Sequence, residues 1–378
     1  MKKRIVIKIG SSSLTSDHGY LDKEKLNHYV KKIVELLQVG YEVVIVSSGA
    51  VAAGFHLLGY STRPDTIEGK QAAAAIGQGL LVQAYNEAFQ TDRYSVAQIL
   101  LTRYDFANRI QYQNAYQTLS MLLKRGIVPI INENDSVAID ELTFGDNDRL
   151  SALVAGLIHA DQLIILTDID GLYDSDPRKN SKAKKLRYIE EITPEIEQLA
   201  ESNGSSIGTG GMRSKLSAAK LALSFGVHVY IGKAILEISL TSIVNGTGNG
   251  TYLGNSQLSS IKTKQQWIAF HSVVEGSLII DDGAVDALIH SGKSLLSAGI
   301  VDVRGTFGRG QVVKVISLSN QLIGKGIVNY SAIELQQIKG ESSEVAMERF
   351  QVDRPEVIHR DDWVTLLEKG EEEELIYE

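Results

Sequence analysis

The chain has 378 residues, of which 43% are hydrophobic and 22% are charged, a composition typical of a globular protein. Two domains are expected, because a single core rarely extends beyond about 250–300 residues. The absence of cysteine excludes disulfides, a thiolate nucleophile and a zinc–cysteine site, and it fits a reducing cytoplasm. The net charge of −8 argues against a general binder of nucleic acids or membrane surfaces.

No segment predicts a secretion signal or a membrane span. The N-terminus is basic (MKKR), but the apolar run that follows covers only residues 5–9 and contains Lys8. Such a run is too short for the hydrophobic region of a signal peptide, and no stretch reaches the roughly 18 apolar residues that a span needs. We therefore expect a cytoplasmic protein that has no membrane association.

Short apolar runs alternate with helical patterns over the first 250 residues. The runs predict strands buried on both faces of a parallel sheet, at 5–9, 43–46, 127–131, 163–166 and 227–231. Apolar residues at three–four spacing predict a first helix between Asp22, as N-cap, and Gly40, as stop. Further helices are predicted over 70–89, 108–124, 148–159 and 212–225. The alternation predicts a doubly wound α/β sandwich (αβα), whose ligands bind beyond the carboxyl ends of the strands.

The pattern changes after a glycine-rich stretch at residues 246–250. From Trp267 onward, short strands and glycines predict a second, smaller, mostly β domain that resembles a barrel. Its strands are predicted at 276–280, 299–303, 312–316 and 323–328, with one short helix at about 282–291. We predict domains at 1–260 and 276–367, a linker at 261–275 and a solvated acidic tail at 368–378.

A glycine-rich loop, Gly208-Thr-Gly-Gly-Met, leads into the helix that carries Lys215. Glycines let backbone N–H groups approach an anion, and the helix N-terminus adds positive potential. The lysine would add a mobile charge for a phosphoryl group. The spacing is not that of a Walker loop, because Leu216 follows the lysine. The alternative is an ordinary flexible loop before a helix.

Three other strand ends carry small or polar residues. Lys8 lies in an apolar strand, which indicates either a nearby anion or an edge strand whose lysine reaches water. Ser47-Ser-Gly-Ala50 forms a turn whose N–H groups suit an anion, although such turns need small residues anyway. Thr167 and Asp168 follow a buried strand, where nucleotides commonly bind, and a local turn is the alternative.

The richest polar segment follows the strand at 127–131. It reads Asn132-Glu-Asn-Asp-Ser136 and continues, after a loop, with Gly145-Asp-Asn-Asp148 at the start of a helix. Such groups can recognise an ammonium group, bind Mg²⁺ or orient lysines. Helix capping by Asp146 or Asn147 explains one of these residues but not the set. Together with the two lysines, the segment indicates phosphoryl transfer from a nucleotide, which relies on positioning and charge neutralisation.

These motifs resemble those of the glutamate 5-kinases, within the amino-acid kinase family. They are Lys8-Ile-Gly-Ser-Ser, Ser47-Ser-Gly-Ala, Asn132-Glu-Asn-Asp-Ser-Val, Phe144-Gly-Asp-Asn-Asp, Leu166-Thr-Asp-Ile-Asp-Gly-Leu-Tyr and Gly208-Thr-Gly-Gly-Met. The nucleotide loops are common to the family, whereas the Asn-Glu-Asn-Asp and Phe-Gly-Asp-Asn-Asp pair with Lys-x-Gly-Ser-Ser points to the glutamate 5-kinases. The resemblance covers the whole chain, because the C-terminal part is similar to the PUA domain that many of these enzymes carry.

The resemblance implies an amino-acid kinase fold and an enzyme that uses ATP and Mg²⁺ to phosphorylate the γ-carboxylate of L-glutamate, the first step of proline biosynthesis. It implies catalytic roles for Lys8, Lys215 and Asp148, with the aspartate holding both lysines. The implied glutamate-binding residues are Ser48, Asp135, Asn147 and Asn132. The implied ATP-binding residues are Lys8, Thr167, Asp168, Thr209, Gly210, Gly211, Met212, Arg213, Ser214 and Lys215. It also implies feedback inhibition by proline and a homo-oligomer, either a dimer or a tetramer. The ligands of the metal remain open.

Two alternatives stay open at this point. PUA domains elsewhere bind RNA, so the chain could be an RNA-binding or regulatory protein. Residues 276–353 carry seven lysines and arginines against nine aspartates and glutamates, a net charge of −2, which argues against contact with a phosphate backbone. The second alternative is a kinase of the same family that acts on another small acid, such as carbamate or acetylglutamate.

Overall fold

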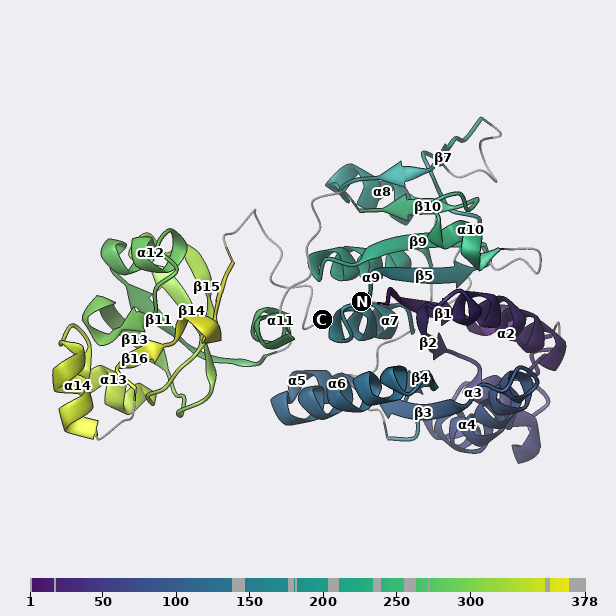
Figure 1. Cartoon of the computed structure of the whole chain (residues 1–378), viewed down its shortest axis with the longest axis horizontal. Helices are drawn as coiled ribbons and strands as arrows, with labels where there is room; N and C mark the ends of the chain where they lie inside the picture. Colours follow the sequence, from purple (N-terminus) through teal and green to yellow (C-terminus); the bar gives the residue numbers. More distant parts are fainter. Residues whose placement is uncertain are drawn as a thin grey trace. The chain divides into compact units, whose positions relative to one another are not determined.

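The computed structural model describes residues 2–16, 18–137, 147–175, 180, 182–202, 211–233, 239–254, 263–270, 272–350 and 354–366 (Figure 1). Its contacts divide the chain into two compact units. The first contains residues 1–105 and 110–261, and the second contains residues 106–109 and 262–378. None of the described helices has the length and apolar character needed to cross a membrane.

The first unit is built on a mixed sheet with the strand order β3-β4-β2-β1-β5-β9-β10-β8 (Figure 1). The strands are β1 (Arg4–Ile9), β2 (Glu42–Ser47), β3 (Val96–Leu101), β4 (Val128–Glu133), β5 (Gln162–Thr167), β8 (Tyr188–Ile189), β9 (His228–Lys233) and β10 (Thr251–Leu253). All neighbours from β3 to β9 are parallel, and β10 is antiparallel to β9. A separate antiparallel pair is formed by β6 (Leu172–Tyr173) and β7 (Lys185–Leu186). The five predicted strands are present; β3, an edge strand with a weaker apolar pattern, was not predicted.

Helices surround this sheet. They are α1 (Ser11–Leu14), α2 (Lys23–Gln38), α3 (Ala50–Gly54), η1 (Phe55–Leu58), α4 (Ile67–Gln90), α5 (Arg103–Ala107), α6 (Arg109–Lys124), α7 (Asn147–Leu157), α8 (Pro194–Ser202), α9 (Met212–Ser224) and α10 (Leu240–Val244). The five predicted helices agree with α2, α4, α6, α7 and α9. Asp22 caps α2 by accepting from the N–H groups of Glu24 and Lys25, and Gly40 follows its end with φ +96°. The doubly wound α/β class is confirmed.

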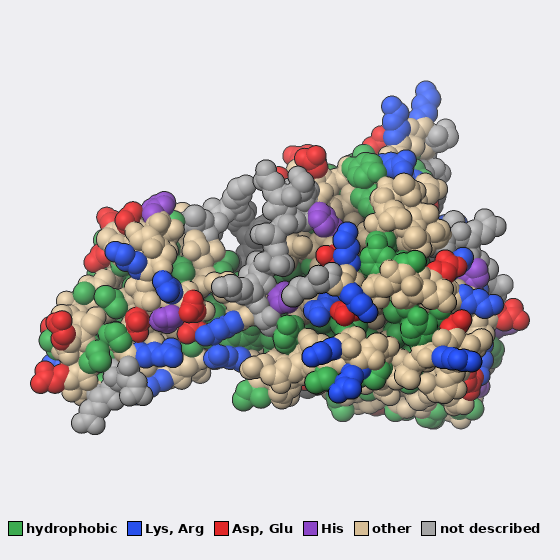
Figure 2. Space-filling model, viewed as in Figure 1, with side chains coloured by type: hydrophobic (Ala, Val, Ile, Leu, Met, Phe, Trp, Pro, Cys, Tyr) green, Lys and Arg blue, Asp and Glu red, His purple; other side chains and the backbone are tan. Residues whose placement is uncertain are grey.

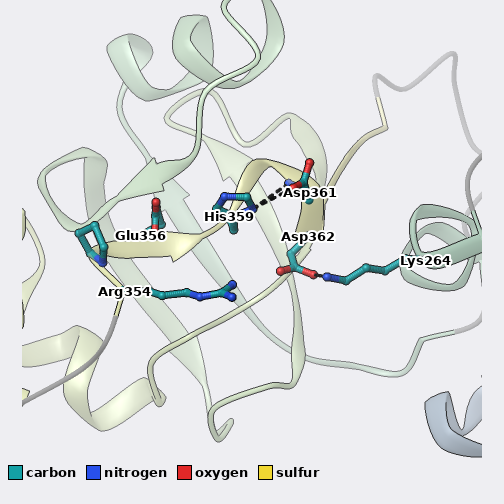
Figure 3. Close-up of a pocket in the computed structure, with 7 residues that line it drawn as sticks. Lys264, Arg354, Glu356, His359, Asp361 and Asp362 are labelled. Atoms are coloured by element: carbon teal, nitrogen blue, oxygen red, sulfur yellow. Dashed lines mark hydrogen bonds and ion pairs between the residues drawn. The ribbon is translucent and has the colours of Figure 1, made fainter.

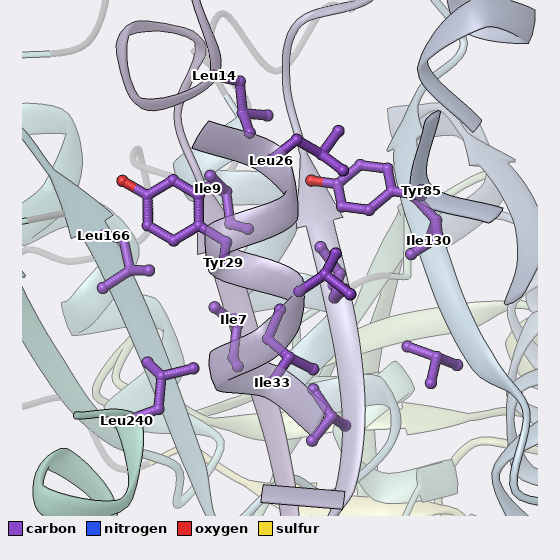
Figure 4. Close-up of a cluster of buried hydrophobic side chains, with 14 of the residues drawn as sticks. Ile7, Ile9, Leu14, Leu26, Tyr29, Ile33, Tyr85, Ile130, Leu166 and Leu240 are labelled. Atoms are coloured by element: carbon purple, nitrogen blue, oxygen red, sulfur yellow. The ribbon is translucent and has the colours of Figure 1, made fainter. Parts of the chain in front are cut away.

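The alternation of side chains along β1 separates the core from the polar site. Ile7 and Ile9 point into a buried apolar cluster formed with α2 and α4, to which Tyr85 of α4 also belongs (Figure 4). Because side chains alternate along a strand, Val6 and Lys8 point to the opposite face, against which α7 packs. The core therefore fixes β1 in a register that directs Lys8 toward α7.

Two glycines let α3 and α4 approach closely. A Cβ on Gly77 would lie 1.8 Å from the carbonyl oxygen of Ala50, and a Cβ on Gly54 would lie 2.1 Å from that of Ala73. Any side chain at either position would therefore push the helices apart. This contact matters for the site, because α3 begins directly after the turn at Ser48 and Gly49.

The second unit contains a five-stranded sheet with the order β13-β11-β14-β15-β17 and a separate pair, β12 with β16. These strands are β11 (Val274–Ile280), β12 (Leu295–Leu296), β13 (Ile300–Gly305), β14 (Val312–Ser317), β15 (Leu322–Ile327), β16 (Glu356–Ile358) and β17 (Trp363–Thr365). Its helices are α11 (Thr263–Phe270), α12 (Asp282–Ile289), η3 (Ser297–Gly299), α13 (Ala332–Ile338), α14 (Ser343–Phe350) and η4 (Arg360–Asp362). The smaller, mostly β domain is confirmed.

The prediction of a single short helix among the later strands is wrong, because α13 and α14 follow β15. The start of α13 carries a readable signal. Ser331 and Glu334 form a reciprocal capping box, in which the serine side chain accepts from the Glu334 N–H and the glutamate accepts from the Ser331 N–H. The Ser-x-x-Glu spacing is a signal of a helix N-terminus, from which this helix could have been predicted.

Candidate active site

The predicted site residues gather at one edge of the first unit's sheet. Lys8 lies near the end of β1, Ser48 directly follows β2, Asn132 lies near the end of β4 and Thr167 ends β5. These strands form a continuous parallel array, so their carboxyl ends share one edge. The first turns of α7 and α9 add Asn147, Asp148 and Lys215, whose side chains contact Ser48, Lys8 and Asp148 respectively.

Asp148 holds both lysines. Its Oδ1 lies 2.5 Å from Nζ of Lys8, and its Oδ2 lies 3.1 Å from Nζ of Lys215. The same Oδ2 accepts a hydrogen bond of 3.1 Å from Oγ of Ser214. Residues from β1, α7 and α9 therefore converge on one carboxylate, which brings together three predicted residues that are far apart in the sequence.

The three charged groups are buried, with Asp148 fully inaccessible and Lys8 and Lys215 only 5% and 4% exposed. The edge-strand alternative for Lys8 is wrong, because β1 is a central strand. Burial by itself would raise the pKa of Asp148, but the charges of Lys8 and then Lys215 outweigh it and lower that pKa. Two cations on one carboxylate leave a net positive charge, which suits a bound anion such as a phosphoryl group.

The lowered pKa of Asp148 predicts a dependence of stability on pH. An unfolded aspartate has a pKa of about 3.9, so below that value protonation favours the unfolded chain. We expect the stabilisation by this cluster to be complete above about pH 5 and to be lost as the pH falls further. Measured between pH 6 and 3, the free energy of unfolding should fall more steeply for the wild type than for Asp148→Asn. Parallel curves for the two proteins would contradict the assignment.

A network of side-chain amides lies next to this cluster. Nδ2 of Asn147 donates to Oγ of Ser48 at 2.9 Å, to Oδ1 of Asn132 at 2.8 Å and to the carbonyl oxygen of Ser47 at 3.0 Å. Nδ2 of Asn132 in turn donates to Oε1 of Gln78 on α4 at 2.9 Å. Asn147 therefore does more than start a helix, because it joins the ends of β2 and β4 to α7.

Hydrogen bonds of the buried Ser47 hold the turn that follows β2. The hydroxyls of the fully buried Ser47 and Tyr85 are hydrogen-bonded at 2.9 Å, and Ser47 also donates to the carbonyl oxygen of Ser48. Gly49 then adopts φ +110°, which favours glycine, and α3 begins. These contacts hold the Ser48 hydroxyl where Asn147 reaches it.

A cavity of about 190 Å³ opens beside the amide network. Its lining includes Gln78, Glu133 at the end of β4 and Asp135 just after it. Burial raises the pKa of Asp135, and the charge of Arg63 offsets part of this effect. A small cavity with two carboxyl side chains and several amides has the chemistry to bind a small molecule that carries an ammonium group.

The predicted nucleotide-binding residues fall partly within the described chain. Gly211 is the N-cap of the 13-residue helix α9 and, being glycine, makes no side-chain cap. Met212, Arg213, Ser214 and Lys215 form its first turn. Thr167 donates to Oδ1 of Asp168 at 2.9 Å, a local contact that agrees with a turn at the end of β5. Thr209 and Gly210 lie outside the described residues, as does Asp146.

Gln78 and Tyr85, which both reach the site from α4, were not predicted from the sequence. A signal was present, because the two residues are seven positions apart and so share one face of the predicted helix. Alanines, glycines, Leu81 and Phe89 otherwise form the buried residues of α4. A polar side chain on an apolar helix face needs a polar partner, and here the partners are Asn132 and Ser47.

The second unit has its own concavity, of about 480 Å³, beside β16 and η4 (Figure 3). Its lining carries both signs of charge, with Lys264 and Arg354 beside Glu356, Asp361 and Asp362, and it also includes His359. Lys264 forms an ion pair with Asp362, and His359 lies close to Asp361. Acidic and basic side chains are also interspersed on the visible face of this unit (Figure 2). Neither view shows the uniformly basic surface that nucleic-acid binding requires.

Known proteins match the chain over almost its whole length. The model of the amino acid kinase family matches residues 3–233, and that of the PUA domain matches residues 276–349. Glutamate 5-kinase 1 of Bacillus licheniformis is 56% identical over 367 residues, 97% of this chain and 100% of the relative. Glutamate 5-kinase 1 of Bacillus subtilis (strain 168) is 54% identical over 366 residues, 97% of this chain and 99% of the relative.

Fold and site thus define an amino-acid kinase with a C-terminal PUA domain. Within that class, the extent and identity of these matches mean that the chain belongs to the glutamate 5-kinase family. The resemblance predicted from the sequence motifs is confirmed.

Proposed function

We infer that the chain catalyses ATP-dependent phosphorylation of the γ-carboxylate of L-glutamate, giving L-glutamyl 5-phosphate and ADP, the first step of proline biosynthesis. The observation that carries this function is the carboxylate of Asp148 with a lysine on each oxygen, next to an amide network and a small acidic cavity. The aspartate with its two lysines suits a transferring phosphoryl group. The amide network and the acidic cavity suit a small amino acid.

In the reaction, an oxygen of the substrate γ-carboxylate forms a bond to the γ-phosphorus of ATP. The bond from that phosphorus to the β,γ-bridging oxygen breaks, and ADP leaves with the electron pair. A carboxylate is already ionised at neutral pH, so no general base is needed. The protein therefore contributes positioning and charge neutralisation.

We assign these contributions to particular residues. Lys8 and Lys215 neutralise charge on the transferring phosphoryl group, and Asp148 holds both ammonium groups in place. Ser48, Asn147 and Asn132 orient the reacting carboxylate, because their polar groups form one network beside the lysines. Asp135 receives the substrate ammonium group in the cavity.

ATP is assigned to the loop and first turn of α9 and to the end of β5, through Thr167, Asp168, residues 209–215 and Lys8. The glycine N-cap of α9 and Lys215 in its first turn are the main support for this assignment, since phosphate binds readily at a helix N-terminus. We propose that Mg²⁺ enters as part of the MgATP substrate. In the described part of the chain, no three histidine or acidic side chains are grouped to hold a metal ion, and Mg²⁺ commonly relies on substrate phosphates with one or two carboxylates.

The test is Mg²⁺-dependent ADP release from ATP with L-glutamate, N-acetylglutamate, aspartate or carbamate, with hydroxylamine present to trap an acyl phosphate. We expect glutamate-selective release together with hydroxamate formation, because the acidic cavity favours a free ammonium group and N-acetylation removes that charge. Preference for another acid would leave the kinase family intact and refute the substrate assignment. A lack of turnover with every acid would support the RNA-binding or regulatory alternative.

Three further properties are proposals that follow from membership of the family. We expect feedback inhibition by proline, a homo-oligomer and a cytoplasmic location, where ATP and glutamate are both present. We do not favour RNA as a partner, because the charge of the C-terminal unit is mixed and its net charge over residues 276–353 is −2. The domain limits of 1–260 and 276–367 likewise stay a proposal.

A further inference from the structure

Gln78 is a buried polar residue to which the proposed mechanism gives no role. It lies in the middle of α4, is 8% exposed and lines the cavity beside the amide network. Its Oε1 accepts from Nδ2 of Asn132, while its Nε2 is buried and has no hydrogen-bond partner in the described chain. A buried amide nitrogen without an acceptor destabilises the folded chain, so such a group in a binding cavity calls for a ligand.

The hydrogen-bond pattern fixes which way the Gln78 amide points. Oδ1 of Asn132 accepts from Asn147 and from the N–H of Glu133, which leaves Nδ2 of Asn132 as the group facing Gln78. A flipped Gln78 would place two NH₂ groups against each other. The two N–H donors of Gln78 are therefore held on the side away from Asn132, where no residue of the described chain accepts from them.

The order of the network places Gln78 at the end of the site that is remote from the phosphoryl group. Asp148 carries the two lysines, the adjacent Asn147 reaches Asn132, and Asn132 reaches Gln78. A γ-carboxylate that reacts beside the lysines puts the α-carbon of the substrate toward Gln78. Glu133 and Asp135 line the same cavity and provide negative charge for the α-ammonium group. An amide donor beside two carboxyl groups complements an amino-acid head group, which has one anionic and one cationic part.

We propose that Gln78 binds the α-carboxylate of the amino-acid substrate through Nε2 and thereby selects acids with a free α-carboxylate. This inference rests on the proposed function. The competing explanation is that Gln78 only braces Asn132, in which case its donor group has no part in choosing the substrate.

The test compares L-glutamate with L-isoglutamine, which keeps the γ-carboxylate but carries an amide in place of the α-carboxylate. Steady-state kinetics use the full chain at pH 8, where a glutamate side chain is ionised. Hydrogen bonds to charged groups contribute about 1.5–3 kcal/mol, so we expect the wild type to prefer L-glutamate in kcat/KM by roughly 10-fold to 150-fold.

In Gln78→Glu, one carboxylate oxygen still accepts from Asn132, but the donor is replaced by a negative charge. We expect KM for L-glutamate to rise about 100-fold or more and the preference over L-isoglutamine to disappear or reverse, with KM for ATP unchanged. The matched control is Gln83→Glu on the exposed side of the same helix, where the side chain donates to Oε1 of Glu87 at 2.8 Å. It should keep the wild-type preference.

A Gln78→Glu enzyme that retains the wild-type preference would overturn the proposal and leave the bracing role. If this variant does not fold, as judged by its thermal transition, Gln78→Met takes its place, because it removes the donor without adding charge; it should also lose the preference. Failure of the proposed function would look different, since the wild type itself would not turn over L-glutamate.

Discussion

Replacing Lys215 or Lys8 with alanine should lower kcat by about 100-fold to 1,000-fold. Each ammonium group lies within 3.1 Å of Asp148 in a buried site, where a positioned donor that neutralises developing charge has its largest effect. The loss should appear mainly in kcat, because the charge that the lysines neutralise is greatest in the transition state. Initial rates of ADP release at saturating L-glutamate and MgATP measure the change.

The matched control for this experiment is Lys220→Ala. Lys220 lies on the same helix as Lys215, but it pairs with Glu197 at the surface, at 3.1 Å. We expect kcat within about twofold of the wild type and a stability change below about 1 kcal/mol, as for other exposed ion pairs. Near-normal turnover of Lys8→Ala or Lys215→Ala in a folded protein would refute the role assigned to that lysine.

Asp148→Asn should abolish turnover and also destabilise the first unit by about 3–5 kcal/mol. The substitution removes the carboxylate that pairs with both buried lysines, and breaking a buried ion pair on one side leaves the partner charges uncompensated. Urea denaturation followed by circular dichroism, analysed for the transition of the first unit, gives the free energy of unfolding.

A second substitution distinguishes the effect of uncompensated charge on stability from the effect of altered packing. The double variant Asp148→Asn with Lys215→Met removes one of the uncompensated cations, so we expect it to regain part of the lost stability while it stays inactive. Asp170→Asn is the surface control: Asp170 pairs with Lys185 at 2.7 Å but is 39% exposed, and its loss should cost below about 1 kcal/mol. Equal stability losses for Asp148→Asn and Asp170→Asn would contradict a dominant role for buried charge.

The sequence by itself determined the α/β class, the strands that carry the site and the family. Apolar runs such as Val43–Val46 predict buried parallel strands because no polar face interrupts them. Glycine-rich turns and the segment from Asn132 to Asp148 predict chemistry because so many polar groups at strand ends are costly unless they bind something. Local cues of this kind depend only on neighbouring residues, so they can be read without knowledge of the fold.

Tertiary structure decided how residues that are distant in the sequence come together in the site. Lys8, Asp148 and Lys215 are joined only because β1 is central and because α7 and α9 begin at the same edge of the sheet. The roles of Gln78 and Tyr85 depend on a close approach of α3 to α4 that two glycines permit. Asn132 lies 54 positions from Gln78, and Asp148 lies 140 positions from Lys8. Such contacts depend on how the elements pack, so local sequence patterns do not reveal them.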